Sequence, residues 1–559
     1  MEKGHKKRDQ RVIMDDETEQ SGGGPFYLGF DLSTQSVKAV VTNDALQVVQ
    51  EVSVKFDQDL PEFGTSGGAN RDPTNSKVVT AQPIMWVKAM GLVLEKLRLL
   101  EPPLLDQIVG ISGAGQQHGS VFWKRGGLET LRNLDPDKFL HDQLAFAFAI
   151  QNSPIWMDSS TSEYCDMLEK AVGGAEVLAK LTGSRAYERF TGSQISKIFH
   201  TKREAYNATE RISLVSSFIA SIFLGSYAAI DYSDASGMNL LDIREKTWSP
   251  ICLAGVVPEE GEGANLAEKL GPPTPTEAVL GTISPYFVER YGFSSDCKVV
   301  AFTGDNPSSF AEMCLGANDI AVSLGTSDTL FLSMPSLPQH GFGEGHIFVN
   351  PIASKDHYMA LLCFKNGSLT RERIRRDYAN GSWSIFNELL DSTPRGNFGN
   401  VGFYYDLWEI IPKIKNGDHK FNKEGSKLTK FTSNEVEVRA LIEGQFLSRR
   451  LHAEKIGCKI TKETKILATG GGSANPKILQ ILSDVFNAPV YVQGDSNSAD
   501  LGACYRVKHA LYGEGRPFDQ FIQSVQAYQK VWDPNKDAKE IYDKMLQRFA
   551  ILEQTILNL

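Results

Sequence analysis

Residues 465–492 carry the pattern that most restricts what this chain can fold into. Residues 465–469 form an apolar strand, and a turn of three glycines then leads to Asn475, an N-cap residue that is followed by a proline. Apolar residues continue at helical spacing, and residues 488–492 form the next strand. Because this connection is short, the two strands are expected to be parallel, with a right-handed crossover. The region therefore predicts an α/β fold.

Two other stretches share a strand, a turn rich in hydroxyl groups and a second strand. Residues 26–30 lead into the turn DLSTQS, which begins at Asp31, and further strands at 37–42 and 48–56 would complete an antiparallel meander. The second copy has strands at 320–324 and 330–334 around the turn GTSDT. This similarity hints at two related halves. Backbone N–H groups in such turns can hold phosphate, and an Asp at a strand end can orient Mg²⁺; the alternative is a pair of ordinary hairpins.

Three further motifs carry possible chemistry. Asp305 comes at the end of a strand and before a helix, where it can take a proton from a substrate hydroxyl or simply cap the helix. Gln117, His118 and Arg189 suit a ligand with many hydroxyl groups, although a lone His or Arg is usually structural. The glycines before Asn475 let a flat base approach the backbone, unless they form a plain βα turn.

Charge and cysteine content exclude several classes of protein. The 559-residue chain has 58 Lys and Arg against 68 Asp and Glu, a net charge of −10, which disfavours binding to nucleic acid or an anionic membrane. Its 7 scattered cysteines favour a reducing compartment. Residues 1–25 lack an apolar core and predict a disordered tail rather than a signal peptide. The uncharged stretch 212–230 contains five serines and is predicted to be a buried helix rather than a membrane span.

These motifs resemble those of the FGGY carbohydrate kinase family, and most of all those of its eukaryotic xylulose kinases. The resemblance runs from about residue 26 to about residue 510. Its most specific stretches are SGAGQQHGSVFW from Ser112, LTGSRAYERFTG from Leu181, DYSDASGMNLLDI from Asp231, GDNPSSF from Gly304, LGTSDT from Leu324, KNGSLTRERIR from Lys365 and ATGGGSANPKILQILSDVF from Ala468.

The resemblance implies two domains of the ribonuclease-H-like, actin-like fold with ATP in the cleft between them. By this similarity, residues 26–312 form the sugar-binding N-terminal domain and residues 313–559 the nucleotide-binding C-terminal domain. Asp305 would be the general base, and Asp31 would help to hold Mg²⁺. The other implied contacts are Gln117, His118, Arg189 and Asn306 for the sugar, and Ser33, Thr34, Gln35, Gly325, Thr326, Trp383, Gly471, Gly472 and Asn475 for ATP.

The activity implied by the resemblance is ATP-dependent phosphorylation of D-xylulose at O5. The protein would be a cytoplasmic monomer or weak homodimer, with no nucleic-acid or membrane partner. Gln117-His118 replaces the Met-His of bacterial relatives, so specificity inferred from those does not transfer directly. The alternatives are a family member acting on ribulose, glycerol or a deoxy-xylulose, an actin- or chaperone-like ATPase, and a catalytically silent sugar-binding protein.

Overall fold

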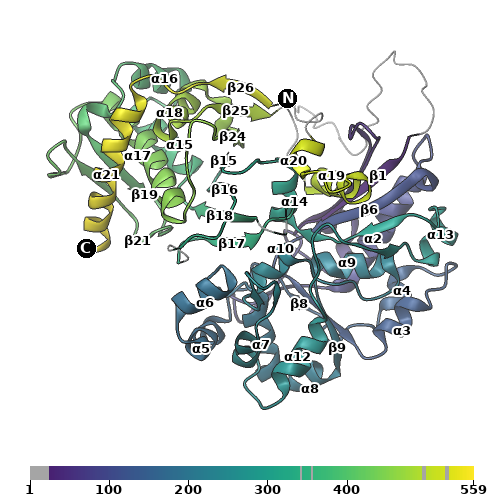
Figure 1. Cartoon of the computed structure of the whole chain (residues 1–559). Helices are drawn as coiled ribbons and strands as arrows, with labels where there is room; N and C mark the ends of the chain where they lie inside the picture. The colour runs from purple at the N-terminus through teal and green to yellow at the C-terminus, as the bar shows by residue number, and fades with distance from the viewer. Residues whose placement is uncertain (1–23, 340–342, 354, 356, 494–498, 523–527) are drawn as a thin grey trace, which may run out of the picture. The chain divides into compact units, whose positions relative to one another are not determined.

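The structure, a computed structural model, describes residues 24–339, 343–353, 355, 357–493, 499–522 and 528–559 (Figure 1). The chain divides into two compact units. Unit 1 contains residues 1–314, 348–355 and 497–525, and unit 2 contains residues 315–347, 356–496 and 526–559. The domain bounds inferred from the sequence stay a prediction, and residues 1–23 of the expected tail lie outside the described residues. The units differ from those bounds because a late helix, within 497–525, packs in unit 1.

Unit 1 is built on a mixed sheet of seven strands. In order across the sheet these are β12 (Val279–Thr282), β13 (Lys298–Val300), β6 (Ile108–Gly115), β1 (Phe26–Leu32), β2 (Ser36–Thr42) and β3 (Val48–Lys55), with β14 (Thr303–Gly304) also beside β6. β1, β2 and β3 are antiparallel, which confirms the predicted meander. β6 is parallel to β1, β13 and β14, so the ends of these strands meet at one edge of the sheet.

Helices cover both faces of this sheet. They include α2 (Pro83–Arg98), α9 (Val215–Leu224), α14 (Asp305–Glu312) and α19 (Ala499–Tyr512). Successive residues of a strand face opposite sides, and accordingly Leu28 and Phe30 pack in the core that contains α2 and α9, whereas Tyr27 packs with α19. A Cβ on Gly29 would lie 2.0 Å from the carbonyl oxygen of Asp500. The close approach of α19 to β1 therefore requires a glycine at this position.

The remainder of unit 1 carries the polar residues that surround the end of β6. Its longer elements are β7 (Ser120–Lys124), α5 (Ser162–Val172), α6 (Ala175–Thr182), α7 (Thr191–Thr201), β9 (Thr209–Leu214), α10 (Tyr232–Ala235), α11 (Pro250–Val256), α12 (Glu262–Leu270) and α13 (Pro285–Tyr291). The prediction of a single helix over 212–230 was wrong at its start, because residues up to Leu214 pair with β7 as a strand. A continuous apolar run cannot distinguish a buried strand from a buried helix. Helix α9 itself is buried, as predicted.

Unit 2 repeats the same arrangement. Its sheet has the order β17 (His346–Val349), β18 (Tyr358–Phe364), β16 (Asp328–Met334), β15 (Ile320–Leu324), β24 (Ile466–Thr469), β25 (Val490–Gln493) and β26 (Tyr528–Trp532). β18, β16 and β15 form an antiparallel series, and β15, β24 and β25 a parallel one. β3, β2, β1, β6 and β13 follow the same two series in unit 1. The shared topology confirms the α/β prediction and supports the inferred relation between the halves.

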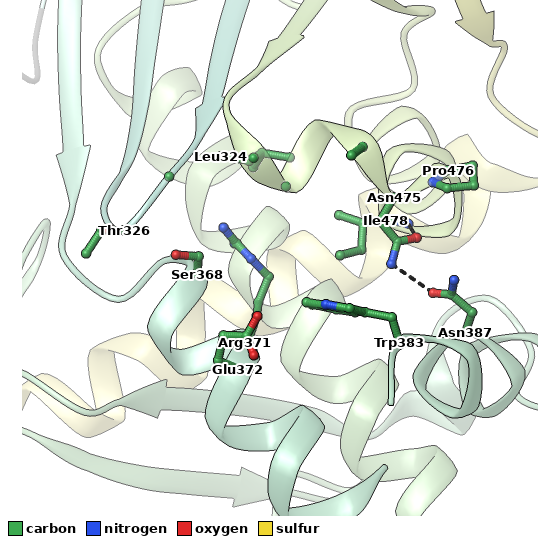
Figure 2. A pocket seen from close by; sticks show the side chains of 14 residues that line it. Leu324, Thr326, Ser368, Arg371, Glu372, Trp383, Asn387, Asn475, Pro476 and Ile478 are labelled. Atoms are coloured by element: carbon green, nitrogen blue, oxygen red, sulfur yellow. Dashed lines mark hydrogen bonds between the residues drawn. The ribbon is translucent and has the colours of Figure 1, made fainter. Parts of the chain in front are cut away.

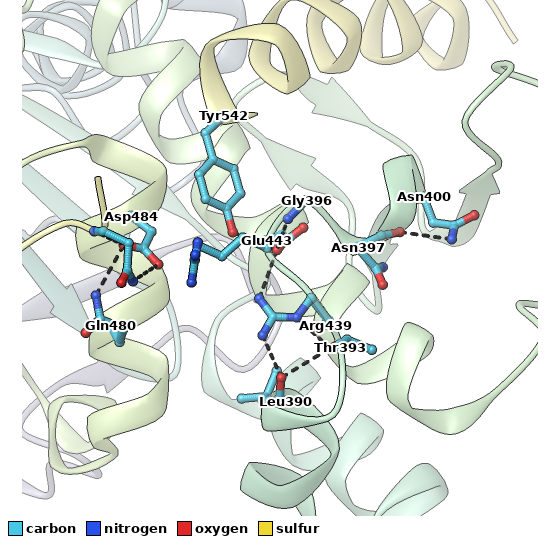
Figure 3. Close-up of polar contacts among 12 residues, drawn as sticks. Leu390, Thr393, Gly396, Asn397, Asn400, Arg439, Glu443, Gln480, Asp484 and Tyr542 are labelled. Atoms are coloured by element: carbon cyan, nitrogen blue, oxygen red, sulfur yellow. Dashed lines mark hydrogen bonds and ion pairs between the residues drawn. The ribbon is translucent and has the colours of Figure 1, made fainter. Parts of the chain in front are cut away.

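Long helices and buried ion pairs fix the rest of unit 2. The helices are α15 (Ser368–Tyr378), α16 (Trp383–Asp391), α17 (Asn434–Lys455), α18 (Pro476–Phe486) and α21 (Ala538–Leu557), and a small sheet contains β19 (Val401–Tyr405), β22 (Gly417–Phe421) and β23 (Lys427–Leu428). Within α17, the buried carboxylate of Glu443 accepts hydrogen bonds from Arg439 at 3.0 Å and from Tyr542 of α21 at 2.7 Å (Figure 3). Arg439 also donates to the carbonyl oxygen of Leu390, at the end of α16.

Candidate active site

In unit 1 the sheet brings three predicted site segments together. β1 ends at Leu32, just after Asp31, and its parallel neighbour β6 ends at Gly115, just before Gln116, Gln117 and His118. β14 pairs with the same end of β6 and leads directly into Asp305, the first residue of α14. Ligand sites of α/β sheets lie beyond the carboxyl ends of the strands, and these side chains occupy that position.

Only one of the two carboxylate oxygens of Asp305 accepts hydrogen bonds from the described residues. Oδ1 accepts hydrogen bonds from the backbone N–H of Asn306 at 2.8 Å, from Asn306 Nδ2 at 3.1 Å and from the N–H of Gln117 at 3.4 Å. Oδ2 accepts none from the described residues. Burial raises the pKa of the Asp305 carboxyl to about 6, although these bonds oppose the shift. The N-cap of α14 is Gly304, so Asp305 does not serve as the cap.

His118 is held as a neutral hydrogen-bond acceptor. Its Nδ1 lies 2.9 Å from the carbonyl oxygen of Gly237, which can only accept, so Nδ1 carries the proton and Nε2 has a free lone pair. The ring stacks on Phe190 at 4.4 Å. Burial, and then the positive charge of Arg189, lower the pKa of His118 to about 3. The guanidinium of Arg189 lies 5.7 Å from the ring centre of Phe190, so His118 and Arg189 both contact this aromatic ring.

Asp31 lies within a cluster of buried carboxylates. Its Oδ1 is buried and has no hydrogen-bond partner among the described residues. Burial, with the charges of Asp500 and Asp305, raises the pKa of Asp31 well above its ordinary value, and Lys38 opposes this. Lys38 Nζ itself lies 3.3 Å from Asp500 Oδ2. A carboxylate oxygen with no partner among like charges suits a divalent cation, which favours oxygen ligands.

The turn after β1 is more ordered than its sequence suggests. The N–H and the hydroxyl of Ser33 both donate to the carbonyl oxygen of Ser36, at 3.0 Å. The Ser33 amide is therefore already used within the turn, which leaves Thr34 and Gln35 at its tip. The hydroxyl of Thr34 accepts a hydrogen bond from Trp156 Nε1 at 2.8 Å.

Unit 2 contains a separate cavity of about 680 Å³ (Figure 2). All of the residues of unit 2 assigned to ATP by resemblance line it: Gly325, Thr326, Trp383, Gly471, Gly472 and Asn475. Asn475 Oδ1 accepts hydrogen bonds from the N–H groups of Lys477 and Ile478, which confirms the predicted cap of α18. Its Nδ2 donates to Asn387 of α16 at 2.9 Å, so the two helices meet at this wall (Figure 2).

The turn after β15 is held in place by a backbone hydrogen bond and by buried ion pairs. The carbonyl oxygen of Gly325 accepts a hydrogen bond from the N–H of Ser368, at the start of α15. Asp328, fully buried, accepts two hydrogen bonds from Arg371, at 2.8 and 3.0 Å, and one from Arg449 at 3.0 Å. Arg371 and Ser368 also line the cavity, so this network shapes its floor.

Sequence reasoning missed several residues that the structure places at these sites. They are Asp234 and Asp500 in unit 1, and Ser368, Arg371 and Asn387 in unit 2. Asp234 falls inside a stretch noted for its resemblance, but nothing local in the sequence assigned it a role. No group of three or more metal-ligating side chains exists within the described ranges. None of the described helices combines the length and the apolar character that crossing a membrane requires.

Comparison with known proteins places the chain among sugar kinases. The family model of the FGGY carbohydrate kinases matches with its N-terminal domain at residues 147–313 and its C-terminal domain at residues 320–511. The xylulose kinase of Rattus norvegicus is 53% identical over 536 residues, which is 95% of this chain and 97% of that protein. The alignments with two solved structures, a xylulose kinase and a glycerol kinase, cover 95–96% of this chain and 99% of each of those chains.

Two solved structures share the fold of this chain and are named for different substrates. The xylulose kinase of Rhodospirillum rubrum superposes with a TM-score of 0.76 at 16% identity. The glycerol kinase of Plasmodium falciparum, solved with ADP, superposes with a TM-score of 0.73 at 15% identity. The fold predicted by resemblance is confirmed, and because both structures match almost equally well, the fold alone does not select the sugar.

Proposed function

The chain belongs to the FGGY family of carbohydrate kinases, and we propose that it transfers the γ-phosphoryl group of ATP to O5 of D-xylulose, giving D-xylulose 5-phosphate and ADP. The observation that carries this is Asp305, whose Oδ2 is unbound among the described residues while its Oδ1 accepts from Gln117, the residue next to the neutral acceptor His118. The 53% identity with a xylulose kinase along 95% of the chain supports the choice of sugar.

In this mechanism, unit 1 supplies the acceptor chemistry. Asp305 Oδ2 accepts the proton of the O5 hydroxyl as that oxygen attacks phosphorus, and a pKa of about 6 leaves the carboxylate ionised at neutral pH. His118 Nε2 and Asn306 Oδ1 accept from sugar hydroxyls, and Arg189 donates to others. The apolar and aromatic packing behind His118 keeps its ring rigid.

Unit 2 supplies the nucleotide site. We propose that Gly471, Gly472, Asn475 and Trp383 hold the nucleoside, and that the backbone of Gly325 and Thr326 holds phosphate. For Ser33, Thr34 and Gln35 of unit 1, contact with ATP is proposed from the family resemblance alone. Asp31 has the ligand chemistry for Mg²⁺, which binds to proteins through one or two carboxylates plus substrate phosphates. When bound, the ion neutralises charge on the transferred phosphoryl group.

We also propose a cytoplasmic location and a monomer or weak homodimer. The location is supported by the seven cysteines, all of which are free thiols, and six of which are buried. Burial raises the pKa of Cys165 and Cys252 to about 11, so neither thiol is reactive.

Substitution of Asp305 tests the proposed function. In a coupled ADP-release assay with D-xylulose, Asp305→Ala and Asp305→Asn should lower kcat about 100- to 10,000-fold, the usual contribution of a general base. Binding of a non-hydrolysable ATP analogue should not change, because every residue that lines the nucleotide cavity belongs to unit 2. Asp305→Asn should also unfold at the same or a higher temperature at pH 8, because it removes a buried charge whose raised pKa opposes folding there.

Near-normal turnover of Asp305→Asn would contradict the assignment. A panel of ribulose, glycerol and deoxy-xylulose in the same assay separates the other sugar kinases of the family. ADP release that does not depend on any sugar would instead favour an ATPase related to actin or to chaperones. Binding of xylulose with no ADP release would indicate a silent sugar-binding protein.

A further inference from the structure

Two complementary polar atoms lie beside Gly304, the residue that precedes Asp305. Asp234 is 1% exposed and Gln117 is 3% exposed, and neither Asp234 Oδ1 nor Gln117 Nε2 has a hydrogen bond to any described residue. Both lie beside Gly304: a Cβ built on that glycine would be 2.7 Å from Asp234 Oδ1 and 2.9 Å from Gln117 Nε2. One atom can only accept a hydrogen bond and the other can only donate. Buried groups of this kind normally satisfy each other.

The other ends of both side chains are already bound. Asp234 Oδ2 accepts a hydrogen bond from Ser216 Oγ at 2.5 Å. Gln117 Oε1 accepts from Asn306 Nδ2 at 2.9 Å, and the same Nδ2 donates to Asp305 Oδ1 at 3.1 Å. A hydrogen bond from Gln117 Nε2 to Asp234 Oδ1 would therefore complete a continuous series of contacts from Ser216 through Asp234, Gln117 and Asn306 to the proposed base.

We propose that Asp234 is a positioning residue for phosphoryl transfer: its carboxyl group fixes the amide orientation of Gln117, which in turn holds Asn306 and Asp305 in the reactive arrangement. This inference rests on the proposed function.

The orientation of one amide matters because of what it exposes. With Nε2 facing Asp234, Oε1 faces Asn306 and takes its amide hydrogen. The Oδ1 of Asn306 is then turned away from Gln117 and is available to a sugar hydroxyl. If the Gln117 amide turned over, two NH₂ groups would face each other, and Asn306 would have to move away from Asp305 Oδ1.

Electrostatics are consistent with this role. Burial and the charge of Asp231 raise the pKa of Asp234 well above its ordinary value, whereas the hydrogen bond from Ser216 and the nearby amide of Gln117 lower it. Asp231 does not compete for the amide, because Thr276 and Thr303 already donate to its Oδ2 at 2.8 and 2.9 Å. Whether or not Asp234 keeps its proton, Oδ1 can accept from Gln117 while Oδ2 shares a hydrogen with Ser216.

A swap of the two groups tests the pair. Gln117→Glu places a carboxylate against Asp234 and should lower kcat with xylulose about 30-fold at pH 8, with the KM for ATP unchanged. In Asp234→Asn/Gln117→Glu, the new Asn donates to the new Glu and every contact is restored with donor and acceptor exchanged. This double variant should recover kcat to within about fivefold of the parent protein.

Two outcomes would overturn the proposal. The first is a loss of less than threefold in kcat for Gln117→Glu, and the second is a double variant whose kcat is no higher than that of Gln117→Glu. A second background guards against a variant that fails to fold. Gln117→Met removes the amide without adding charge and should lower kcat about tenfold, and adding Asp234→Asn should then change kcat less than twofold. A further loss equal to that of Asp234→Asn alone would show that the residues act independently.

Gln480→Glu is the matched control. Gln480 Nε2 donates to Asp484, a buried carboxylate in α18, at 3.2 Å, so the substitution opposes like charges in the same way without touching unit 1 (Figure 3). Its kcat should stay within twofold. If the parent phosphorylates no sugar at all, the proposed function fails, and the pair is then tested by urea unfolding: the double variant should regain the stability that Gln117→Glu loses, and additive losses would overturn the pairing.

Discussion

The two sites of this protein treat buried charge in opposite ways. In unit 1, the charge of Asp305 contributes to the raised pKa values of both Asp31 and Asp234, and several polar atoms around these carboxylates have no partner within the described structure. In unit 2, buried Asp328 at the turn after β15 is held by two arginines through three hydrogen bonds. One site is electrostatically unsatisfied and the other is neutralised.

This difference in charge balance fits the roles proposed for the two sites, which are proton acceptance in unit 1 and phosphate binding in unit 2. A general base needs a pKa raised toward neutrality and a free oxygen, and both arise from burying carboxylates with too few cations nearby. A phosphate turn needs a fixed backbone, which a saturated ion network provides. The proposed base of unit 1 therefore lowers folding stability, whereas the buried ion pairs of unit 2 fix the backbone of a turn. Each of the following experiments perturbs the buried charges, or their partners, in one of the two units.

Arg371→Met should have the largest effect. It leaves buried Asp328 with only Arg449, and breaking a buried ion pair costs about 3 kcal/mol or more of unfolding free energy. Because Arg371 lines the nucleotide cavity, the Kd of an ATP analogue should rise as well. Chemical denaturation and calorimetric titration measure the two effects.

Arg373→Met is the control for that change. Arg373 lies two residues along the same helix and pairs with Asp418 through two hydrogen bonds, but its side chain is 25% exposed. Exposed pairs contribute about 0–1 kcal/mol, so its loss should be small. Equal losses at both positions would refute the distinction between a structural network and a surface ion pair.

The sequence predicted the local motifs of this molecule better than its long-range hydrogen-bond networks. The hairpins and the Asn475 cap were readable because all their contacts fall within a few residues. The prediction of Asp305 as a site residue also rested on a local motif. Asp234 was missed because its partners are distant in sequence, and the bond between Gln117 and Asn306 joins residues 189 positions apart. Such pairs exist only once the sheet has brought β6 and β14 together.

The pH dependence of turnover tests the unsatisfied side of the comparison. Burial disfavours the ionised form of Asp305 and raises its pKa to about 6, and the base must be ionised to accept a proton. We expect kcat/KM for xylulose to fall about tenfold per pH unit below 6 and to be level above it. Binding of the ATP analogue should not follow this profile, since Asp305 does not line the nucleotide cavity. An acidic limb centred near pH 4 would mean that Asp305 is solvated during turnover or is not the base.

Tyr542→Phe should have the smallest effect, because it removes one of several hydrogen bonds to Glu443 Oε1 and changes no charge. The phenol of Tyr542 is one of three donors to buried Glu443, and Arg439 and the N–H of Gly396 remain, both at 3.0 Å (Figure 3). Losing one hydrogen bond of such a set costs about 1 kcal/mol, so unit 2 should unfold at a slightly lower urea concentration. Since Arg439 still holds the end of α16, whose first residue is Trp383, the KM for ATP should change less than twofold. A larger change in KM would mean that the C-terminal helix positions the nucleotide, and that the network of unit 2 is less rigid than its paired charges indicate.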